Sequence, residues 1–408
     1  MSNITERDYK NALKDGFDFD DFKSVDQKRA IECIMTGEKN ILISLATQAG
    51  KSLCYQLISS FQRDGIILVI APSISLITNQ IAYLTEMRIP ATSITSVAPL
   101  SNREEKIKEF YDYKNVPYKF LFITPEMLIR GSYKVRDLIE FLLEENQISH
   151  IAVDEAHMIV DYNNNFRDSF KELGQVRKKY SEIPWIALTT ASNVILNKIA
   201  RILCMIRPQI IRGPSTRKNI FYDVMQSRNE SFVDFKSIIK DMIELNEEEE
   251  FFTTRKVYAS GIIYCKTNHN ADHIAHNLCE NGITSESFYG AKRDVNDIQK
   301  RWKEGQFPVL VATEESFGLG IKRNPLQFVL HMSMPKNLRA FYQQSGRIDV
   351  ENGYSRIYVN KFYNGDVSPE MLAFINIKDC RHKHIAEYFG DEILENCGNK
   401  CDNCVKNQ

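Results

Sequence analysis

The segment from Ile41 to Leu57, ILISLATQAGKSLCYQL, limits the folds open to this chain more than any other. It opens with an apolar run that predicts a buried parallel strand, and it closes with residues that have the composition of a helix start. The small residues between them end in Gly50-Lys51-Ser52. A strand, a small-residue loop and a helix in this order are typical of a phosphate-binding loop, in which backbone N–H groups and the helix N-terminus bind phosphate oxygens.

Three residues of this loop have separate expected roles. Gly50 lets the backbone approach a phosphate closely, Lys51 neutralises the β- and γ-phosphates, and the Ser52 hydroxyl holds magnesium. The match to G-x-x-x-x-G-K-[ST] is incomplete, because Leu45 stands where the first glycine usually lies. Taken alone, the loop therefore stays open to a second interpretation, an ordinary turn that contains Gly-Lys-Ser by chance.

A second segment supports the nucleotide interpretation. The apolar strand Ser149–Val153 runs directly into Asp154-Glu155, which Ala and His follow. A carboxylate at the end of a neighbouring strand is what nucleotide-bound magnesium needs, so Asp154 is the expected ligand and Glu155 the residue that polarises the attacking water. An Asp-Glu pair is also common at a solvated helix start, but its place after a buried strand favours the catalytic role.

Composition sets broad limits. With 408 residues, 43% hydrophobic and 26% charged, the chain is expected to form two or three soluble globular domains. No apolar run is long enough to cross a membrane, and the first residues begin no signal peptide. The net charge of −1 provides no global attraction for nucleic acid, so DNA or RNA binding requires a local groove. Nine cysteines, mostly scattered singly, indicate a reducing compartment.

Short apolar runs alternate with helical segments in two series, which predicts two parallel sheets with ligands at the carboxyl ends of their strands. The first series is Ile41–Leu45, Ile66–Ala71, Phe120–Thr124, Ile151–Val153 and Trp185–Thr189, and the second is Gly261–Cys265, Ser285–Tyr289, Val309–Thr313, Phe328–His331 and Ser355–Tyr358. Turn formers near Gly213-Pro214 separate them, so the expected domains are 1–213, 214–363 and 364–408. In this tandem arrangement the segment from Gln343 to Arg347 is expected to reach the γ-phosphate from the second domain.

Gln27 lies in a helix-like run upstream of the phosphate loop. A glutamine amide can read both edge groups of adenine, although an ordinary surface glutamine is the alternative.

Four cysteines gather near the C-terminus with the spacing C-x16-C-x3-C-x2-C. They are Cys380, Cys397, Cys401 and Cys404. This spacing predicts a closed tetrahedral zinc site with a structural role, and four free cysteines in a tail are the alternative. The predicted helix Arg381–Phe389 carries His382 and His384, which are expected on its surface.

The motifs together resemble the RecQ family of superfamily 2 DNA helicases over nearly the whole chain, in particular the branch of the fifth human paralogue and its metazoan relatives. The matching segments are Phe22-Lys23-Ser24 with Gln27, Gly50–Leu57, Ala152–His157, Ser316-Phe317-Gly318, Tyr342–Arg347 and Tyr388–Asp391. Phe389-Gly390-Asp391 before four cysteines is the most specific, because it separates RecQ proteins from RNA helicases that share the D-E-A-H box.

The resemblance implies an α/β fold with two tandem RecA-like parallel-sheet domains and a small zinc-binding helical module. It implies a nuclear motor for DNA repair, recombination or replication, which couples ATP hydrolysis to 3′ to 5′ translocation on single-stranded DNA and separates duplexes. By motif position, Lys23 and Gln27 contact adenine, Lys51, Ser52, Asp154 and Glu155 act on the phosphates and magnesium, and Gln343 and Arg347 complete the site. Tyr162, Phe166, Arg167 and Phe170 fall in the aromatic-rich loop that couples DNA to ATP, which suits stacking on single strands.

Four residues depart from the family pattern where the chemistry is concentrated. Gln48 and Ala49 replace two glycines of the phosphate loop, and a residue with a side chain resists φ > 0. Lys322 replaces an aspartate, and Val350 replaces the second of two arginines. Because an arginine finger is worth about 10³ to 10⁵ in rate, this last loss matters most.

One finger, Arg347, remains, and Arg323 or Arg356 is a candidate substitute for the other. The departures leave two further functions open: a nucleotide- and DNA-binding scaffold that has lost hydrolysis, and an RNA helicase whose cysteine cluster is incidental. The retained Lys51, Asp154 and Glu155 favour the enzyme. No sequence feature names a protein partner.

Overall fold

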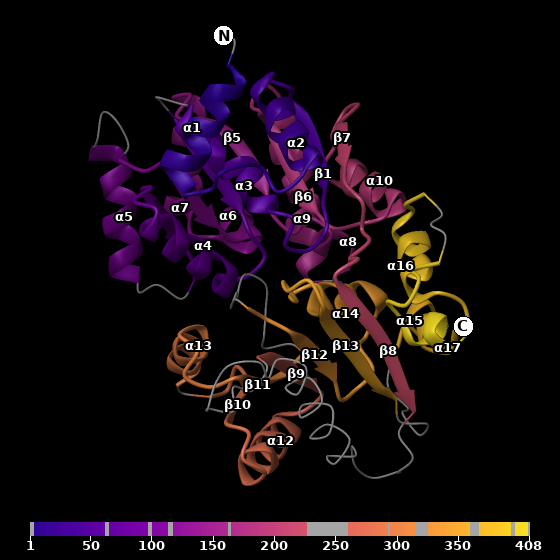
Figure 1. Cartoon of the computed structure of the whole chain (residues 1–408). Helices are drawn as coiled ribbons and strands as arrows, with labels where there is room; N and C mark the ends of the chain where they lie inside the picture. Colours follow the sequence, from indigo (N-terminus) through magenta and orange to yellow (C-terminus); the bar gives the residue numbers. More distant parts are fainter. Residues whose placement is uncertain are drawn as a thin grey trace. The chain divides into compact units, whose positions relative to one another are not determined.

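The computed structural model describes residues 4–61, 65–96, 100–112, 117–161, 165–226, 260–292, 294–314, 325–359, 367–392 and 396–406. The chain divides into two compact units, Met1–Pro214 and Ser215–Gln408, each built on one sheet (Figure 1). No helix in the described part of the chain combines the length and apolar character that a membrane crossing requires.

The first unit contains a seven-stranded sheet in the order β3-β4-β2-β5-β6-β1-β7, in which every pairing is parallel. The strands are β1 Asn40–Ser44, β2 Ile66–Ile70, β3 Ala91–Ile94, β4 Phe120–Ile123, β5 Ile148–Val153, β6 Trp185–Thr189 and β7 Gln209–Arg212. Every residue of β2, β4 and β6 is buried, as expected of parallel strands whose sheet is covered on both faces.

The connections of this unit are helices: α1 Glu6–Phe17, α2 Val25–Met35, α3 Lys51–Gln56 with the 3₁₀ turn η1 Leu57–Ser60, α4 Ile74–Glu86, α5 Leu100–Asp112, α6 Pro125–Arg130, α7 Tyr133–Glu144, α8 Met158–Asp161, α9 Asn165–Lys179 and α10 Asn193–Ile202. Ser73 and Thr124 cap α4 and α6 by accepting a backbone N–H bond at the third residue of each helix. Gly50 is the N-cap residue of α3 and offers no side chain to cap the helix. The phosphate loop therefore leads directly into the first turn of α3.

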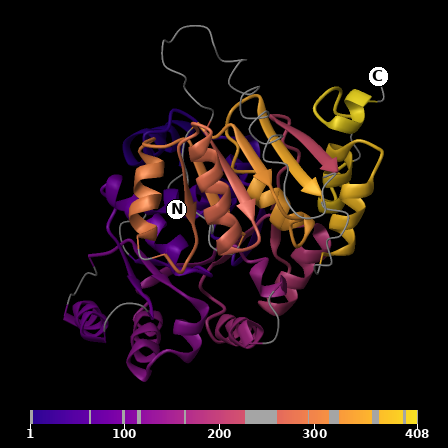
Figure 2. The ribbon, with the colours of Figure 1, turned by 90° about the horizontal axis from the view of Figure 1, so that it is seen from below.

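The second unit contains a six-stranded sheet in the order β10-β11-β9-β12-β13-β8, also with parallel pairings. Its strands are β8 Ile220–Gln226, β9 Gly261–Cys265, β10 Ser285–Phe288, β11 Val309–Thr313, β12 Phe328–His331 and β13 Gly353–Val359. Its helices are α12 Asn268–Glu280, α13 Val295–Lys303, α14 Leu338–Ser345, α15 Pro369–Asn376, α16 Arg381–Phe389 and α17 Asp402–Lys406. The helix α12 packs on β10 and β11 (Figure 2).

All ten predicted strands are confirmed, most of them within one or two residues of their predicted ends. Three strands, β3, β7 and β8, were not predicted from the sequence. Two of them, β3 and β7, are only four residues long, and β8 mixes polar residues with apolar ones because alternate side chains are only partly buried.

The end of the chain is attached to the edge of the second sheet. Tyr222 on β8 forms an isolated parallel bridge with Cys401, and its backbone N–H donates to the Lys400 carbonyl. The cysteine-bearing segment thus covers the outer edge of β8, which β13 does not pair. This coverage satisfies backbone groups that an open sheet edge leaves exposed.

Candidate nucleotide site and cysteine cluster

Three neighbouring strands of the first sheet, β1, β6 and β5, deliver side chains to one place at their carboxyl ends. Lys51 follows β1, and its Nζ lies 2.9 Å from Oγ1 of Thr190, which follows β6. Thr190 in turn donates to the Leu45 carbonyl at 2.7 Å. Asp154 follows β5 directly. The lysine and the carboxylate are therefore held at the ends of strands that β6 separates.

The phosphate loop has an uneven backbone. Gly50 has φ +77°, and a Cβ atom there would lie 2.2 Å from Nε2 of Gln27, so a substitution would be strained and would displace the Gln27 amide. Gln48 also takes a positive φ, of 63°, although a residue with a side chain resists it. Ala49 does not, and its N–H donates to the Ala46 carbonyl. Of the two substituted glycines, only Gln48 thus carries backbone strain, of about 1 to 2 kcal/mol.

Gln27 is completely buried, which excludes the interpretation as a surface glutamine. Its Oε1 accepts the Lys23 N–H at 2.8 Å, and its Nε2 donates to the Gly50 carbonyl at 2.9 Å. The Lys23 ammonium donates to the Gln48 carbonyl at 3.2 Å. The structure thus brings together Lys23, Gln27 and the phosphate loop, which were expected to bind the adenine base and the phosphates.

The two acidic residues are almost completely buried, with 4% of Asp154 and 9% of Glu155 exposed. Burial, followed by the Glu155 charge, raises the pKa of Asp154 to about 7. Glu155 has φ +47°, and one of its carboxylate oxygens lies 3.3 Å from Nδ1 of His157. A pair of buried carboxylates of this kind is stabilised by a divalent cation, so the site fits magnesium.

Ser52 and Asp154, the expected magnesium ligands, are supported by two residues that received no role from the sequence. The Tyr55 hydroxyl donates to Oδ2 of Asp154 over 3.4 Å, and Tyr55 lies on α3, which also carries Ser52. Gln80 on α4 donates to Ser52 Oγ at 3.1 Å. Tyr55 lies within the motif around Lys51, so the motif could have indicated it as a site residue. Gln80 lies in no motif.

The second-unit candidates lie on α14 or just after it. Gln343 is within α14, and Arg347 lies beside Tyr264, opposing with its charge the rise that burial causes in the pKa of that tyrosine. The backbone at Val350 is held in place, because its carbonyl accepts a hydrogen bond from the Asn219 side-chain amide at 2.9 Å.

Arg356, a candidate substitute for the missing arginine, is engaged elsewhere, which argues against that role. Its guanidinium forms an ion pair with Asp223, at 2.5 Å, and both side chains are nearly nine-tenths buried. Arg323 and Lys322 lie outside the described residues, as does the Ser316-Phe317-Gly318 segment.

The residues expected to couple DNA to ATP are only partly described. Tyr162 lies outside the described residues, and Phe166, Arg167 and Phe170 are placed on α9 by their backbone alone.

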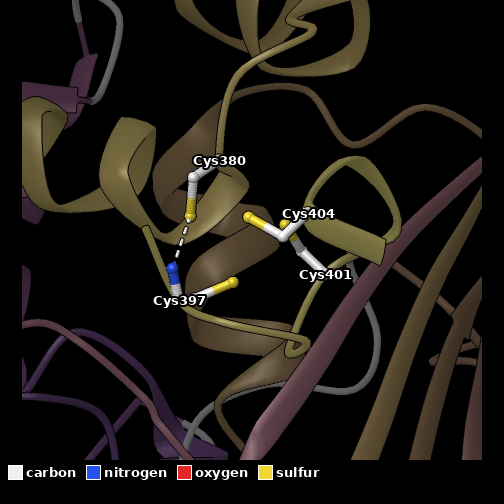
Figure 3. Close-up of side chains that lie close together, drawn as sticks. All are labelled: Cys380, Cys397, Cys401 and Cys404. Atoms are coloured by element: carbon white, nitrogen blue, oxygen red, sulfur yellow. Dashed lines mark hydrogen bonds between the residues drawn. The ribbon is translucent and has the colours of Figure 1, made fainter. Parts of the chain in front are cut away.

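The four cysteines converge as predicted (Figure 3). Their sulfur atoms all lie within 4.8 Å of one another, and the Cys397 N–H donates to Cys380 Sγ at 3.3 Å. Sulfur atoms bound tetrahedrally to zinc lie about 3.8 Å apart, since a Zn–S bond is about 2.3 Å. The arrangement therefore fits one zinc ion with four thiolate ligands.

His382 does not lie on the surface as expected. It is 4% exposed, and its Nε2 lies 3.0 Å from the Ile220 carbonyl and 3.1 Å from the Lys400 carbonyl. These carbonyls require the protonated nitrogen as donor, and burial lowers the pKa of the ring. His382 thus ties α16 to β8 and to the cysteine loop.

The Phe389-Gly390-Asp391 motif has a structural role within the second unit. Gly390 ends α16 with φ +77°, which glycine adopts without strain. The Asp391 carboxylate then accepts both the backbone N–H and the hydroxyl of Ser215 at 2.6 Å. The motif thus fixes the start of the second unit against the end of α16.

Three family sequence profiles match the chain in order. They are the DEAD/DEAH box helicase over residues 24–196, the helicase conserved C-terminal domain over 240–349 and RecQ zinc-binding over 363–405. Curated relatives include ATP-dependent DNA helicase Q5 of Rattus norvegicus, 29% identical over 98% of this chain and 44% of its own length. ATP-dependent DNA helicase Q1 of the same species is 30% identical over 97% of this chain and 65% of its own length. The chain thus spans less than half the length of the Q5 relatives.

Solved structures share the fold at low identity. Mss116p bound to ssRNA and AMP-PNP has a TM-score of 0.68 at 15% identity, covering 88% of this chain and 73% of its own. The DUF1998 helicase MrfA bound to DNA has a TM-score of 0.68 at 17% identity, covering 97% of this chain and 55% of its own.

Two parallel-sheet units, a phosphate loop and an Asp-Glu pair at neighbouring strand ends agree with the two helicase profiles, and together they indicate the class of helicase proteins with two RecA-like domains. Within that class, the RecQ zinc-binding profile on the cysteine segment and the relatives that match almost all of the chain point to RecQ proteins. The chain is similar to RecQ helicases over nearly its whole length.

Proposed function

We propose that this protein is an ATP-dependent DNA helicase, which couples hydrolysis to 3′ to 5′ translocation on single-stranded DNA and so separates duplexes. The observation that carries the proposal is the convergence of Lys51, Thr190 and Asp154 at three neighbouring strand ends. The Lys51 ammonium on one side and the buried Asp154 and Glu155 carboxylates on the other provide the charges that a nucleoside triphosphate with magnesium requires.

Each site residue has a proposed role. Lys23 and Gln27 contact adenine, Gly50 and Lys51 bind the phosphates, and Ser52 and Asp154 hold magnesium. Glu155 orients and polarises the attacking water, and Nδ1 of His157 lies 3.3 Å from its carboxylate. Gln343 and Arg347 contribute from the second unit by stabilising charge on the transferred phosphoryl group. The zinc ion on Cys380, Cys397, Cys401 and Cys404 is structural, because four thiolates leave no open coordination position.

DNA is the proposed polymer partner, in single-stranded and forked form, and the nucleus the proposed compartment. The relatives are named ATP-dependent DNA helicases, which supports a role in DNA repair, recombination or replication. Tyr162, Phe166 and Arg167 are proposed to couple DNA to the ATP site by stacking on bases and binding phosphate. Tyr162→Ala is then expected to abolish DNA stimulation while leaving nucleotide affinity intact.

The test is steady-state ATP hydrolysis with and without single-stranded DNA, comparing the protein with Glu155→Gln. Turnover that DNA stimulates and that the variant loses supports the motor. Unwinding of duplexes with a 3′ tail, but not of those with a 5′ tail, supports the polarity. Equal stimulation by RNA and DNA strands would instead favour an RNA helicase, and it contradicts the proposed substrate.

A second candidate function is a nucleotide- and DNA-binding scaffold without hydrolysis. The strained Gln48 in the phosphate loop and the commitment of Arg356 to Asp223, with Val350 in the place of an arginine, favour it. This function predicts that nucleotide binds while turnover stays at the level of Glu155→Gln, with DNA present or absent.

A further inference from the structure

Tyr55 links two groups that come from different parts of the first sheet. Ser52 belongs to the helix that follows β1, and Asp154 follows β5. Because β6 lies between these strands, their backbones are about 9 to 10 Å apart at two strand spacings. Two ligands of one small cation must approach each other across that separation. Tyr55 lies on the helix that carries Ser52, and its hydroxyl donates to Oδ2 of Asp154 over 3.4 Å.

The tyrosine is held rigidly. It is completely buried, and its ring packs edge-on against Phe120 with a centroid distance of 6.3 Å. A second support reaches Ser52 from α4, where Gln80 donates to Ser52 Oγ at 3.1 Å. Gln80 is itself fixed, because its Oε1 accepts from the buried Gln56 amide at 2.7 Å.

These hydrogen bonds leave each expected ligand able to accept a cation. A hydroxyl oxygen has two acceptor positions, and the Gln80 amide uses one of them at Ser52. The Asp154 carboxylate is held at both oxygens, because Tyr55 donates to its Oδ2 while the Glu155 N–H donates to its Oδ1.

We propose that Tyr55 and Gln80 are positioning residues that hold Asp154 and Ser52, respectively, in the geometry for binding the magnesium of a bound nucleotide. This inference rests on the proposed nucleotide site but not on hydrolysis. Outer hydrogen-bond partners of metal ligands usually contribute 10- to 100-fold to metal affinity, which sets the expected size of the effect.

The test uses the full chain and the variant Tyr55→Phe, which keeps the ring and removes only the hydroxyl. Binding of a fluorescent ADP is measured during a magnesium titration and again in excess EDTA. We expect the half-saturating magnesium concentration to rise about tenfold, with affinity in EDTA unchanged within about twofold. Bound Mn²⁺, followed by electron paramagnetic resonance, is expected to weaken in parallel.

Two further variants separate positioning from packing. Gln80→Met removes the donor to Ser52 at similar size, and we expect a shift in the same direction; it also serves as the test if Tyr55→Phe does not fold. Tyr83→Phe, on the same helix as Gln80 and away from this chain of bonds, is the matched control and is expected to bind like the wild type.

The outcomes are distinguishable from failure of the helicase function. An unchanged magnesium requirement in both Tyr55→Phe and Gln80→Met overturns the inference, as does an equal loss of affinity with magnesium and with EDTA. If the wild type binds the magnesium nucleotide but does not hydrolyse ATP, the helicase function fails while the shift in Tyr55→Phe still supports the positioning role. A wild type that binds no nucleotide overturns both.

Discussion

Arg381 and Asp402, the residues that directly follow two of the four cysteines, form a buried two-bond ion pair. The Nε and one terminal nitrogen of Arg381 lie 2.5 and 3.0 Å from the two Asp402 carboxylate oxygens. The other terminal nitrogen donates to the Phe374 carbonyl, and the side chains are only 3% and 6% exposed. The pair thus joins the start of α16 to the start of α17, and through them it joins Cys380 to Cys401.

Removing the charge of Asp402 is expected to destabilise the second unit strongly. Asp402→Asn keeps the shape of the side chain but leaves the Arg381 guanidinium buried without its partner, which costs about 3 to 5 kcal/mol. Urea unfolding followed by circular dichroism measures the loss. Glu104→Gln breaks the exposed Lys134–Glu104 pair and is the control, expected to cost less than about 1 kcal/mol. Equal losses in the two variants would contradict the structural role of the buried pair.

Metal removal is expected to unfold the same region. One zinc ion per chain should be released by a strong chelator, with a lower melting temperature, because the apo cluster loses the bonds that join Cys380 to the C-terminal loop. Cys404→Ser should bind zinc more weakly than the wild type, whereas Cys279→Ser, an exposed cysteine outside the cluster, should not. A zinc content near zero in the purified wild type, with an unchanged melting temperature after chelation, would refute the assignment.

Much of the architecture was predictable because parallel strands buried on both faces are continuous apolar runs. The strands β9, β11, β12 and the helix α16 were predicted to their terminal residues. The edge strand β7 was missed because two of its residues, Gln209 and Ile210, are exposed, so that it has no continuous buried run.

The site was predictable where chemistry requires a residue type in a local pattern, as at Lys51 and the cysteines. It was not predictable where a side chain finds partners far along the chain. His382 was expected on the surface, but its ring pairs with a carbonyl 162 positions away. Likewise, Gln80 reaches Ser52 from another helix, and no pattern within α4 indicates that contact.

The strain at Gln48 is expected to appear in a pair of glycine substitutions. Gln48→Gly removes the cost of a positive φ and keeps the carbonyl that accepts from Lys23, so it should raise stability by up to about 1 kcal/mol. Ala49→Gly lies next to it without a positive φ, and it should lower stability by about 0.5 to 1 kcal/mol through greater freedom of the unfolded chain. Thermal unfolding compares the two. Identical shifts would mean that the loop is not strained at Gln48.

The folded chain is expected to lose stability as the pH falls, because of His331 on β12. Its ring stacks on Tyr264 with a centroid distance of 5.3 Å, and burial lowers its pKa to about 4. An unfolded histidine has a pKa of about 6.5, so the unfolded chain binds more protons between these values, and stability present above pH 6.5 is lost as pH falls toward 4. His331 then contributes a loss of about 2 kcal/mol between pH 7.5 and pH 5. Urea unfolding at both pH values should show a smaller loss in His331→Gln, whatever its stability at pH 7.5. His276→Gln, at a side chain that is 70% exposed, is the control. A wild-type slope in His331→Gln would show that its ring is protonated in the folded chain.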